Sequence, residues 1–306
     1  MIHVNFKYIL FFAIFLLTSC ATIPPRHALN DDDKRNIHSN NILLNSNQHE
    51  IVMRHNNWFD SDLPDPHLPM PSGPIVPQAG ITSFPPTVLI VKGIQSHLGS
   101  IAISPIRSTI KDFDFLKTFN VEIQNTVAKL PWLKVKKQVI KYDLKSKESE
   151  IVADANENTT LFIGTTYALN SNFKKLEVAA YVKLAEKSNN NREPHTLYTN
   201  NMYFIYRLPE PNKNTKENKK YWINNNGEQL KEKLHDAASL LANMIKVDIG
   251  NSHSNIYQSN NKLIAFRNIN GSKTEGHLIK QQNGYYIISS NDNEIYVVNE
   301  HDLIVS

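Results

Sequence analysis

A strand-turn-strand pattern between residues 161 and 184 is the feature that most constrains how this chain can fold. Leu161–Leu169 is an apolar segment typical of a strand, and Asn170-Ser171-Asn172 is typical of a turn. From Leu176 to Leu184, apolar residues then alternate strictly with other residues, two of which are charged. Because side chains of a strand point alternately to its two faces, this pattern predicts a β-hairpin with one buried face and one wetter face.

Helical patterns on both sides of the hairpin can cover its buried face. Leu116 to Leu130 carries apolar residues at helical spacing, with Asp112 as the candidate N-cap, and a second helix is predicted from about Glu228 to Val247. The asparagine- and lysine-rich stretch 212–226 is predicted to be a loop. Residues 87–250 should therefore form an α+β domain, an antiparallel sheet packed by two helices. Its other strands are predicted at Val88–Val91, Ile101–Ile103, Trp132–Asp143 and Leu197–Leu208.

Residues 251–306 contain short β-rich pieces separated by turn sequences, and we predict a separate small β domain there. Asn283-Gly284 lies between two apolar runs, which is a strong signal of a hairpin. Five short strands in so few residues favour an SH3-like barrel. A β-meander docked on the main domain is the alternative.

Residues 1–19 have the pattern of a secretory signal peptide. Lys7 precedes Tyr8–Leu17, an apolar run of ten residues, and the small residues Thr18 and Ser19 come directly before Cys20. A membrane-spanning helix needs about 20 apolar residues, so this run is too short. The sequence around Cys20 resembles the lipobox of bacterial lipoproteins, which implies cleavage between Ser19 and Cys20 and lipidation of Cys20. In that class, Ala21 after the cysteine implies the outer membrane, with the periplasmic side as the default.

Cys20 is the single cysteine of the chain, so no disulfide can staple the fold and its stability must come from a hydrophobic core. Residues 20–86 hold ten of the fifteen prolines and no apolar periodicity. Such a segment buries too little apolar surface to offset its ordering entropy, so we expect a disordered tether behind the lipidated cysteine. It is either a plain spacer or a proline-rich stretch that docks a partner.

No motif with catalytic chemistry is found in the sequence. The pattern H-E-x-x-H, the G-x-S-x-G elbow, the P-loop and the dinucleotide-binding glycines are all missing. His49 and His55 flank Glu50 but stand too far apart for a zinc helix, and we expect neither a metal nor a cofactor. A formal net charge of +4 is too mild to indicate nucleic acid as a partner.

Two groups of residues are candidates for binding. Lysines in the predicted strand 132–143 could form a basic contact surface for an acidic partner or an anionic polymer, although a simply solvated strand face has the same pattern. Aromatic residues could form a groove for a glycan, although such residues more commonly lie half-buried in a sheet. The lysines are Lys134, Lys136, Lys137 and Lys141, and the aromatic residues are Tyr198, Tyr203, Tyr206 and Trp222.

From Thr87 to Ile249, the predicted order of strands and helices resembles the α+β domain of several periplasmic lipoproteins. These are the activators of penicillin-binding proteins, the curli-secretion lipoprotein and the amino-terminal domain of TolB; the β unit after residue 260 departs from them. The resemblance implies a periplasm-facing outer-membrane lipoprotein, anchored in the bilayer through Cys20. It would act as a non-catalytic, tethered binding or assembly module for a cell-envelope protein. The alternatives are binding of peptidoglycan or another glycan through the C-terminal β unit, and an enzyme that processes envelope polymers.

Overall fold

The computed structural model describes residues 29–46, 48–54, 99–142, 151–152, 156–188, 194–212, 214–250, 262–269 and 271–304. Its strands are β1 Asn40–Ser46, β2 Val52–Arg54, β3 Val135–Tyr142, β4 Thr159–Asn170, β5 Lys175–Glu186, β6 His195–Arg207, β7 Leu263–Arg267, β8 Lys273–Gln282, β9 Tyr285–Ser290 and β10 Ile295–Asn299. Its helices are α2 Asp31–Asn36, α4 Phe115–Asn125 and α6 Thr215–Gly250, with short 3-10 helices η1 Val127–Lys129 and η2 Glu300–Asp302. Residues 99–109 are also helical.

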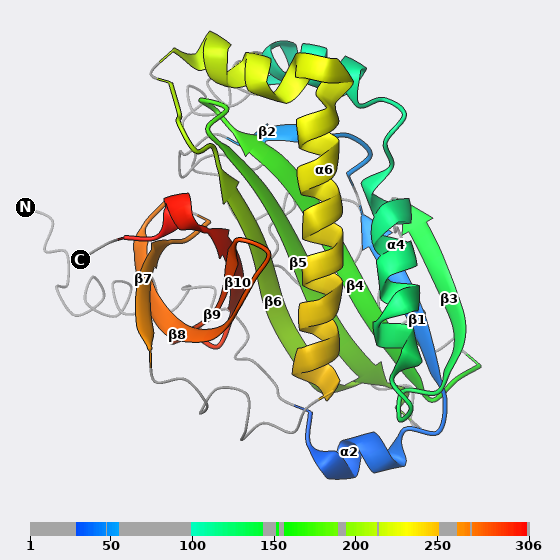
Figure 1. Cartoon of the computed structure of the whole chain (residues 1–306). Coiled ribbons are helices and arrows are strands. Elements are labelled where there is room, and N and C mark those ends of the chain that lie inside the picture. Colours follow the sequence, from blue (N-terminus) through cyan, green and yellow to red (C-terminus); the bar gives the residue numbers. More distant parts are fainter. Residues whose placement is uncertain are drawn as a thin grey trace, which may run out of the picture.

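All ten strands belong to one sheet, and the fold is α+β as predicted. The strand order is β3-β1-β4-β5-β6-β10-β9-β8-β7, and β2 also pairs with β4 (Figure 1). The predicted hairpin is confirmed as β4 and β5, which pair antiparallel with β6 beside them. The sheet is mostly antiparallel, but β1 runs parallel to both β3 and β4, and β10 runs parallel to β6.

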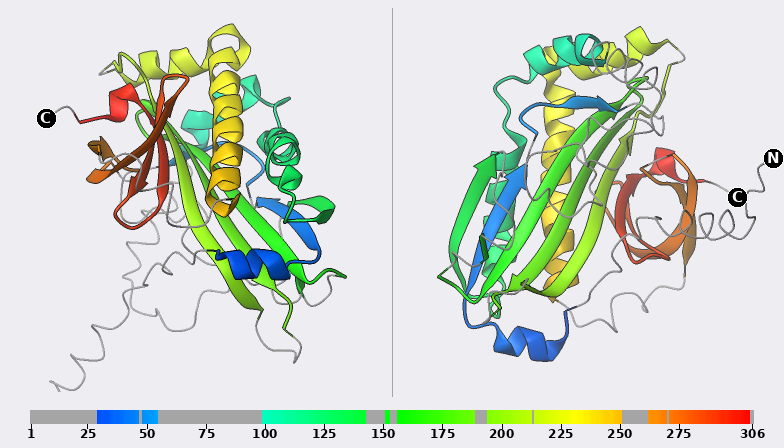
Figure 2. Two further views of the ribbon diagram at one scale, coloured as in Figure 1. Left: turned by 60° about the horizontal axis from the view of Figure 1, so that its bottom comes forward. Right: turned by 180° about the vertical axis from the view of Figure 1, so that it is seen from behind.

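The two main helices lie on one face of the sheet, as the periodic patterns predicted. α6 crosses β4, β5 and β6, and α4 lies over the β1 and β3 side (Figure 1). Figure 2 shows the same face in profile, with both helices on the same side of the strands. The α4 N-cap is Asp114 rather than Asp112, because its side chain accepts from the Lys117 backbone N–H at 3.0 Å.

The expectation that all of residues 20–86 form a disordered tether is wrong for residues 29–54. This segment forms α2, β1 and β2, and β1 lies inside the sheet between β3 and β4. Apolar side chains of this segment belong to the main core, because β1 is buried between its two neighbouring strands. The core residues of this segment are Leu29, Ile37, Ile42, Leu44 and Ile51.

Two polar side chains continue the pairing with β4 where the backbone of β1 stops. The Ser46 hydroxyl donates to the Thr165 carbonyl at 3.0 Å, and the Gln48 amide oxygen accepts from the Tyr167 N–H at 3.0 Å. β2 then pairs with the end of β4. Side chains therefore take the place of missing backbone partners, so that residues 40–46 and 48–54 together lie along β4.

Two further expectations about secondary structure are wrong. The strand predicted at Ile101–Ile103 is part of the helix at 99–109, where Ile103 is buried and Ile101 is exposed. The loop predicted at 212–226 is helical from residue 215, and α6 contains a kink with non-helical backbone from Asn224 to Gly227. Gly227 permits this kink because its φ is +71° and a Cβ there would lie 2.8 Å from Ile110. The predicted strand Val88–Val91 lies outside the described residues.

The C-terminal strands form an antiparallel meander that continues the main sheet, rather than a separate domain. β10 joins the edge of β6, and β9, β8 and β7 follow in order. The meander curls beside the sheet in Figures 1 and 2. It covers part of the face that the sequence predicted to be wetter, so that β5 is buried on both faces. This second core contains Ala179, Tyr203, Ile205, Ile264, Phe266, Ile269, Ile288, Tyr296 and Val298.

Candidate functional site

The lysines predicted as a contact surface lie together on β3, the strand at one end of the sheet, and at Lys134 directly before it. Lys134, Lys136, Lys137 and Lys141 are all exposed, and we call these four residues the lysine edge. Within the described part of the chain, none of the four makes an ion pair. Among the described residues, the strand therefore presents unpaired positive charge at the border of the sheet.

Two polar contacts with α4 hold β3 in place from its helix-facing side. The Gln138 side-chain amide donates to the Asn120 carbonyl at 3.0 Å and to its side-chain oxygen at 2.8 Å. The Tyr142 hydroxyl donates to both carboxylate oxygens of Asp114, at 2.9 and 2.7 Å. Burial, and then the hydrogen bond to Asp114, raise the pKa of Tyr142 to about 12, so this hydroxyl stays a donor.

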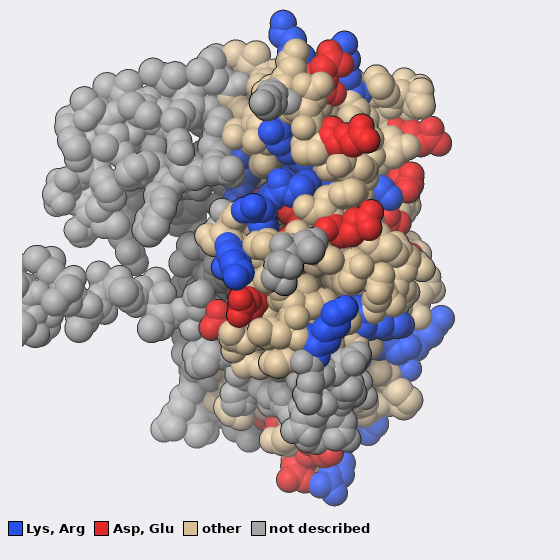
Figure 3. All heavy atoms as spheres, turned by 60° about the vertical axis from the view of Figure 1, so that its left-hand side comes forward, with Lys and Arg blue, Asp and Glu red and all other residues tan. Residues whose placement is uncertain are grey.

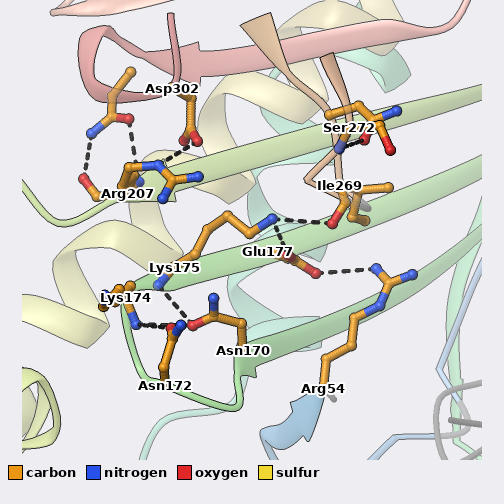
Figure 4. Close-up of polar contacts among 12 residues, drawn as sticks. Arg54, Asn170, Asn172, Lys174, Lys175, Glu177, Arg207, Ile269, Ser272 and Asp302 are labelled. Carbon is orange, nitrogen blue, oxygen red and sulfur yellow. Dashed lines mark hydrogen bonds and ion pairs between the residues drawn. The ribbon is translucent and has the colours of Figure 1, made fainter. Parts of the chain in front are cut away.

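A cluster of buried charges, which the sequence did not predict, joins the hairpin to β2 and to the C-terminal meander (Figure 4). The Lys175 Nζ lies 2.6 Å from Glu177 and donates to the Ile269 carbonyl at 3.1 Å, while Arg54 contacts the other oxygen of Glu177 at 3.1 Å. Lys175 and Glu177 are each only 3% exposed. We call the five charged residues of this region the charge cluster: Arg54, Lys175, Glu177, Arg207 and Asp302.

Arg207 and Asp302 form a third ion pair of the cluster, between β6 and η2. The Arg207 Nε donates to Asp302 at 2.7 Å, and Asn299 brackets the backbone of Arg207 with hydrogen bonds of 3.2 and 2.7 Å. Burial raises the pKa of the Asp302 carboxyl, although Arg207 opposes this shift. Because these charges are paired inside the fold, we interpret the charge cluster as structural: it connects the β5–β6 part of the sheet to β2 and to the C-terminal strands. The charged alternation at Lys175 and Glu177 is visible in the sequence, but their distant partners are not.

A cleft of about 380 Å³ lies between α6 and the meander. In it, the Lys233 Nζ is held by Glu232 at 2.7 Å and Asp236 at 3.0 Å, and the Tyr285 hydroxyl donates to Asp236 at 2.8 Å. Burial alone would lower the pKa of Lys233, but these hydrogen bonds raise it. The charged side chains of the cleft are thus paired with one another by ion pairs and hydrogen bonds. On the face shown in Figure 3, Lys and Arg are interspersed with Asp and Glu, without a large area of one sign.

The four aromatic residues predicted as a groove do not form one surface. Tyr206 and Trp222 pack edge to face with ring centroids 6.1 Å apart, but Tyr203 lies in the other core. Tyr203 points into the core under the meander and stacks on Tyr296, with ring centroids 4.8 Å apart. Tyr198, Tyr206 and Trp222 belong to the core on the helix side, and Trp222 is fully buried with its Nε1–H donating to the Phe173 carbonyl at 2.7 Å. Buried positions on opposite faces of the sheet leave no shared aromatic surface for a glycan.

The residues of the predicted lipidation site, Ser19 and Cys20, lie outside the described residues. Of the histidines, His38 is exposed and His49 stacks on Tyr142 with ring centroids 5.5 Å apart. In the described ranges, no cluster of His, Cys, Asp or Glu is arranged to hold a metal ion. No helix within those same ranges is long and apolar enough to cross a membrane.

No protein-family model, curated protein or solved structure matches this chain. The resemblance to penicillin-binding-protein activators, the curli-secretion lipoprotein and TolB therefore stays a prediction from the sequence.

Proposed function

We propose that this protein is a periplasm-facing outer-membrane lipoprotein that binds a cell-envelope protein through the lysine edge, without catalysing a reaction. The observation that carries the proposal is the lysine edge itself. Four exposed lysines without an ion pair among the described residues lie on a border strand or directly before it. The charges of the cleft and of the charge cluster, in contrast, are paired internally. Free charge at a surface is available for electrostatic steering and recognition of an acidic partner.

The anchor that we propose at Cys20 would hold the folded part close to the membrane. Leu29 is 1% exposed and belongs to the main core, so only residues 21–28 separate the proposed lipid from the fold. Eight residues span at most about 29 Å when fully extended, at up to about 3.6 Å each. The partner should then be a protein of the membrane surface, within reach of a module held at that surface.

For the C-terminal strands we propose a finer description, an SH3-like unit fused to the sheet edge. Supporting it, Leu303 forms an antiparallel bridge with Phe266 of β7, and the Ile304 N–H donates to the Ala265 carbonyl at 2.8 Å. The chain after η2 thereby returns to β7, as the last strand of a small barrel would.

Crosslinking in intact cells, followed by mass spectrometry, tests the binding function. We expect a reproducible envelope protein crosslinked to the wild type, and its loss when Lys137→Glu and Lys141→Glu are combined. Cys20→Ser should abolish fatty-acid incorporation and release the protein from the membrane fraction. If no protein is captured reproducibly, or if only peptidoglycan is recovered, the proposed protein-binding function is wrong; unchanged fractionation of Cys20→Ser would refute the anchor alone.

A further inference from the structure

β3 is an edge strand, and the way it is built bears on what kind of partner it can take. Its eight residues run from Val135 to Tyr142, and among the described residues it pairs with β1 alone. An edge strand carries a row of backbone N–H and C=O groups that its own sheet does not pair, and an extended peptide can add to such a row as a further strand.

Both faces of β3 are anchored inside the fold, and one of them also carries exposed lysines. Gln138, Ile140 and Tyr142 point toward α4, where they hydrogen-bond or pack against the main core. By alternation, Lys137 and Lys141 lie on the opposite face, on either side of Val139. Val139 itself packs against a small cluster that includes Leu43 and Phe162. The strand is thus anchored on both faces by residues other than its lysines.

The positive charge of the lysine edge determines which extended segments can pair with β3 without electrostatic repulsion. A second copy of β3 would bring lysines opposite lysines, and like charges directly across a strand pair are destabilising. Lys136 is also the extra residue of a bulge, since Asn40 pairs with Val135 and Asn41 with Lys137. Lysines and bulges discourage pairing between identical edges. An extended segment with acidic side chains meets no such repulsion and gains opposite-charge pairs.

We infer that β3 adds one extended acidic segment of a partner protein as an extra strand of this sheet. The inference rests on the proposed binding function and names the class of partner: a protein with an unpaired segment rich in Asp and Glu. Backbone hydrogen bonds along the edge supply affinity, and the lysine edge supplies selectivity for acidic side chains.

A fluorescent peptide of alternating Glu and Thr, as long as β3, is the probe, titrated against the full-length protein by fluorescence anisotropy. Its control is the same peptide with alternate backbone amides N-methylated on its pairing edge, which keeps the charge and removes the donors. We expect the methylated peptide to bind more than about tenfold more weakly, because several backbone hydrogen bonds are lost.

Two double variants separate the lysine edge from overall charge. Lys137→Glu with Lys141→Glu should weaken binding by about tenfold or more, whereas Lys246→Glu with Lys280→Glu, which changes the net charge equally at exposed sites elsewhere, should weaken it by less than about threefold. Equal binding of both peptides, equal losses in both variants, or no binding at all would overturn strand addition. Equal binding of both peptides alone would leave the proposed binding function standing, as a purely electrostatic contact at the lysine edge. Equal losses in both variants would also remove the lysine edge as the contact surface, while failure of crosslinking in cells would refute the binding function itself.

Discussion

The place of β1 inside the sheet predicts a large cost for truncating Leu44. This side chain is fully buried in the main core, and its strand lies between β3 and β4. In a disordered tether, the same truncation would leave the free energy of unfolding unchanged. Leu44→Ala therefore measures directly whether residues 29–54 are part of the fold.

The magnitude follows from the burial of the side chain. Leu44→Ala removes the Cγ and both Cδ atoms, which at about 0.8 kcal/mol per buried carbon loses about 2.4 kcal/mol of transfer free energy. The cavity that remains adds to this loss, and buried Leu→Ala changes cost about 2–5 kcal/mol in all. We expect a decrease of about 3–4 kcal/mol in the free energy of unfolding.

Urea denaturation, followed by both far-UV circular dichroism and tryptophan fluorescence, measures this difference, and agreement of the two probes supports two-state analysis. Leu263→Ala is the matched control: the same change on β7, where the side chain is 54% exposed, should cost less than about 1 kcal/mol. If Leu44→Ala costs no more than Leu263→Ala, β1 is not a core strand and the described sheet is wrong at that edge.

Three more changes test the interior. Glu177→Ala should cost about 3–5 kcal/mol in urea denaturation, because it leaves the buried Lys175 and the partly buried Arg54 without their carboxylate. Glu186→Ala on the same strand, at a more exposed pair, should cost under about 1 kcal/mol; equal costs would refute a structural role for the charge cluster. Gly276→Ala should cost about 1–3 kcal/mol, since its Cβ would lie 2.4 Å from the Ser289 carbonyl oxygen, and an unchanged denaturation midpoint would contradict that packing. Because burial raises the pKa of Asp302 above 3.8, the folded protein binds this proton more tightly than the unfolded chain. Its contribution to stability is then fully present below pH 3.8 and decreases as the pH rises through the folded pKa; Asp302→Asn should flatten that slope in denaturation curves across pH, and parallel slopes would argue against it.

Periodic segments were predictable from the sequence because their signal is local. The β4–β5 hairpin shows period two and the helices show period 3.6, and each pattern records which residues face the core. The exposure of the lysines on β3 was also predictable, because a charged side chain on a strand at the border of a sheet remains in contact with solvent.

Elements whose partners are distant in the sequence were missed. β1, with the sequence NNILLNS, is a short apolar run between asparagines, and only its neighbours β3 and β4 make it a buried strand. Glu177 and Lys183 suggested a wetter face, but the meander of the last strands covers part of that face. Glu177 is paired there with Lys175, which also donates to the Ile269 carbonyl. Burial there depends on contacts across roughly ninety residues, which no local pattern records.

Photo-crosslinking from a single position can show whether β3 is the surface that meets the partner protein. Benzoyl-phenylalanine placed at Lys137, on the edge of the sheet, is compared in intact cells with the same residue at Lys246, an exposed position on α6. The account predicts a discrete protein adduct on irradiation from position 137 and none of the same mass from position 246. Equal adducts from both positions, or none from position 137, would contradict the claim that β3 is the contact surface.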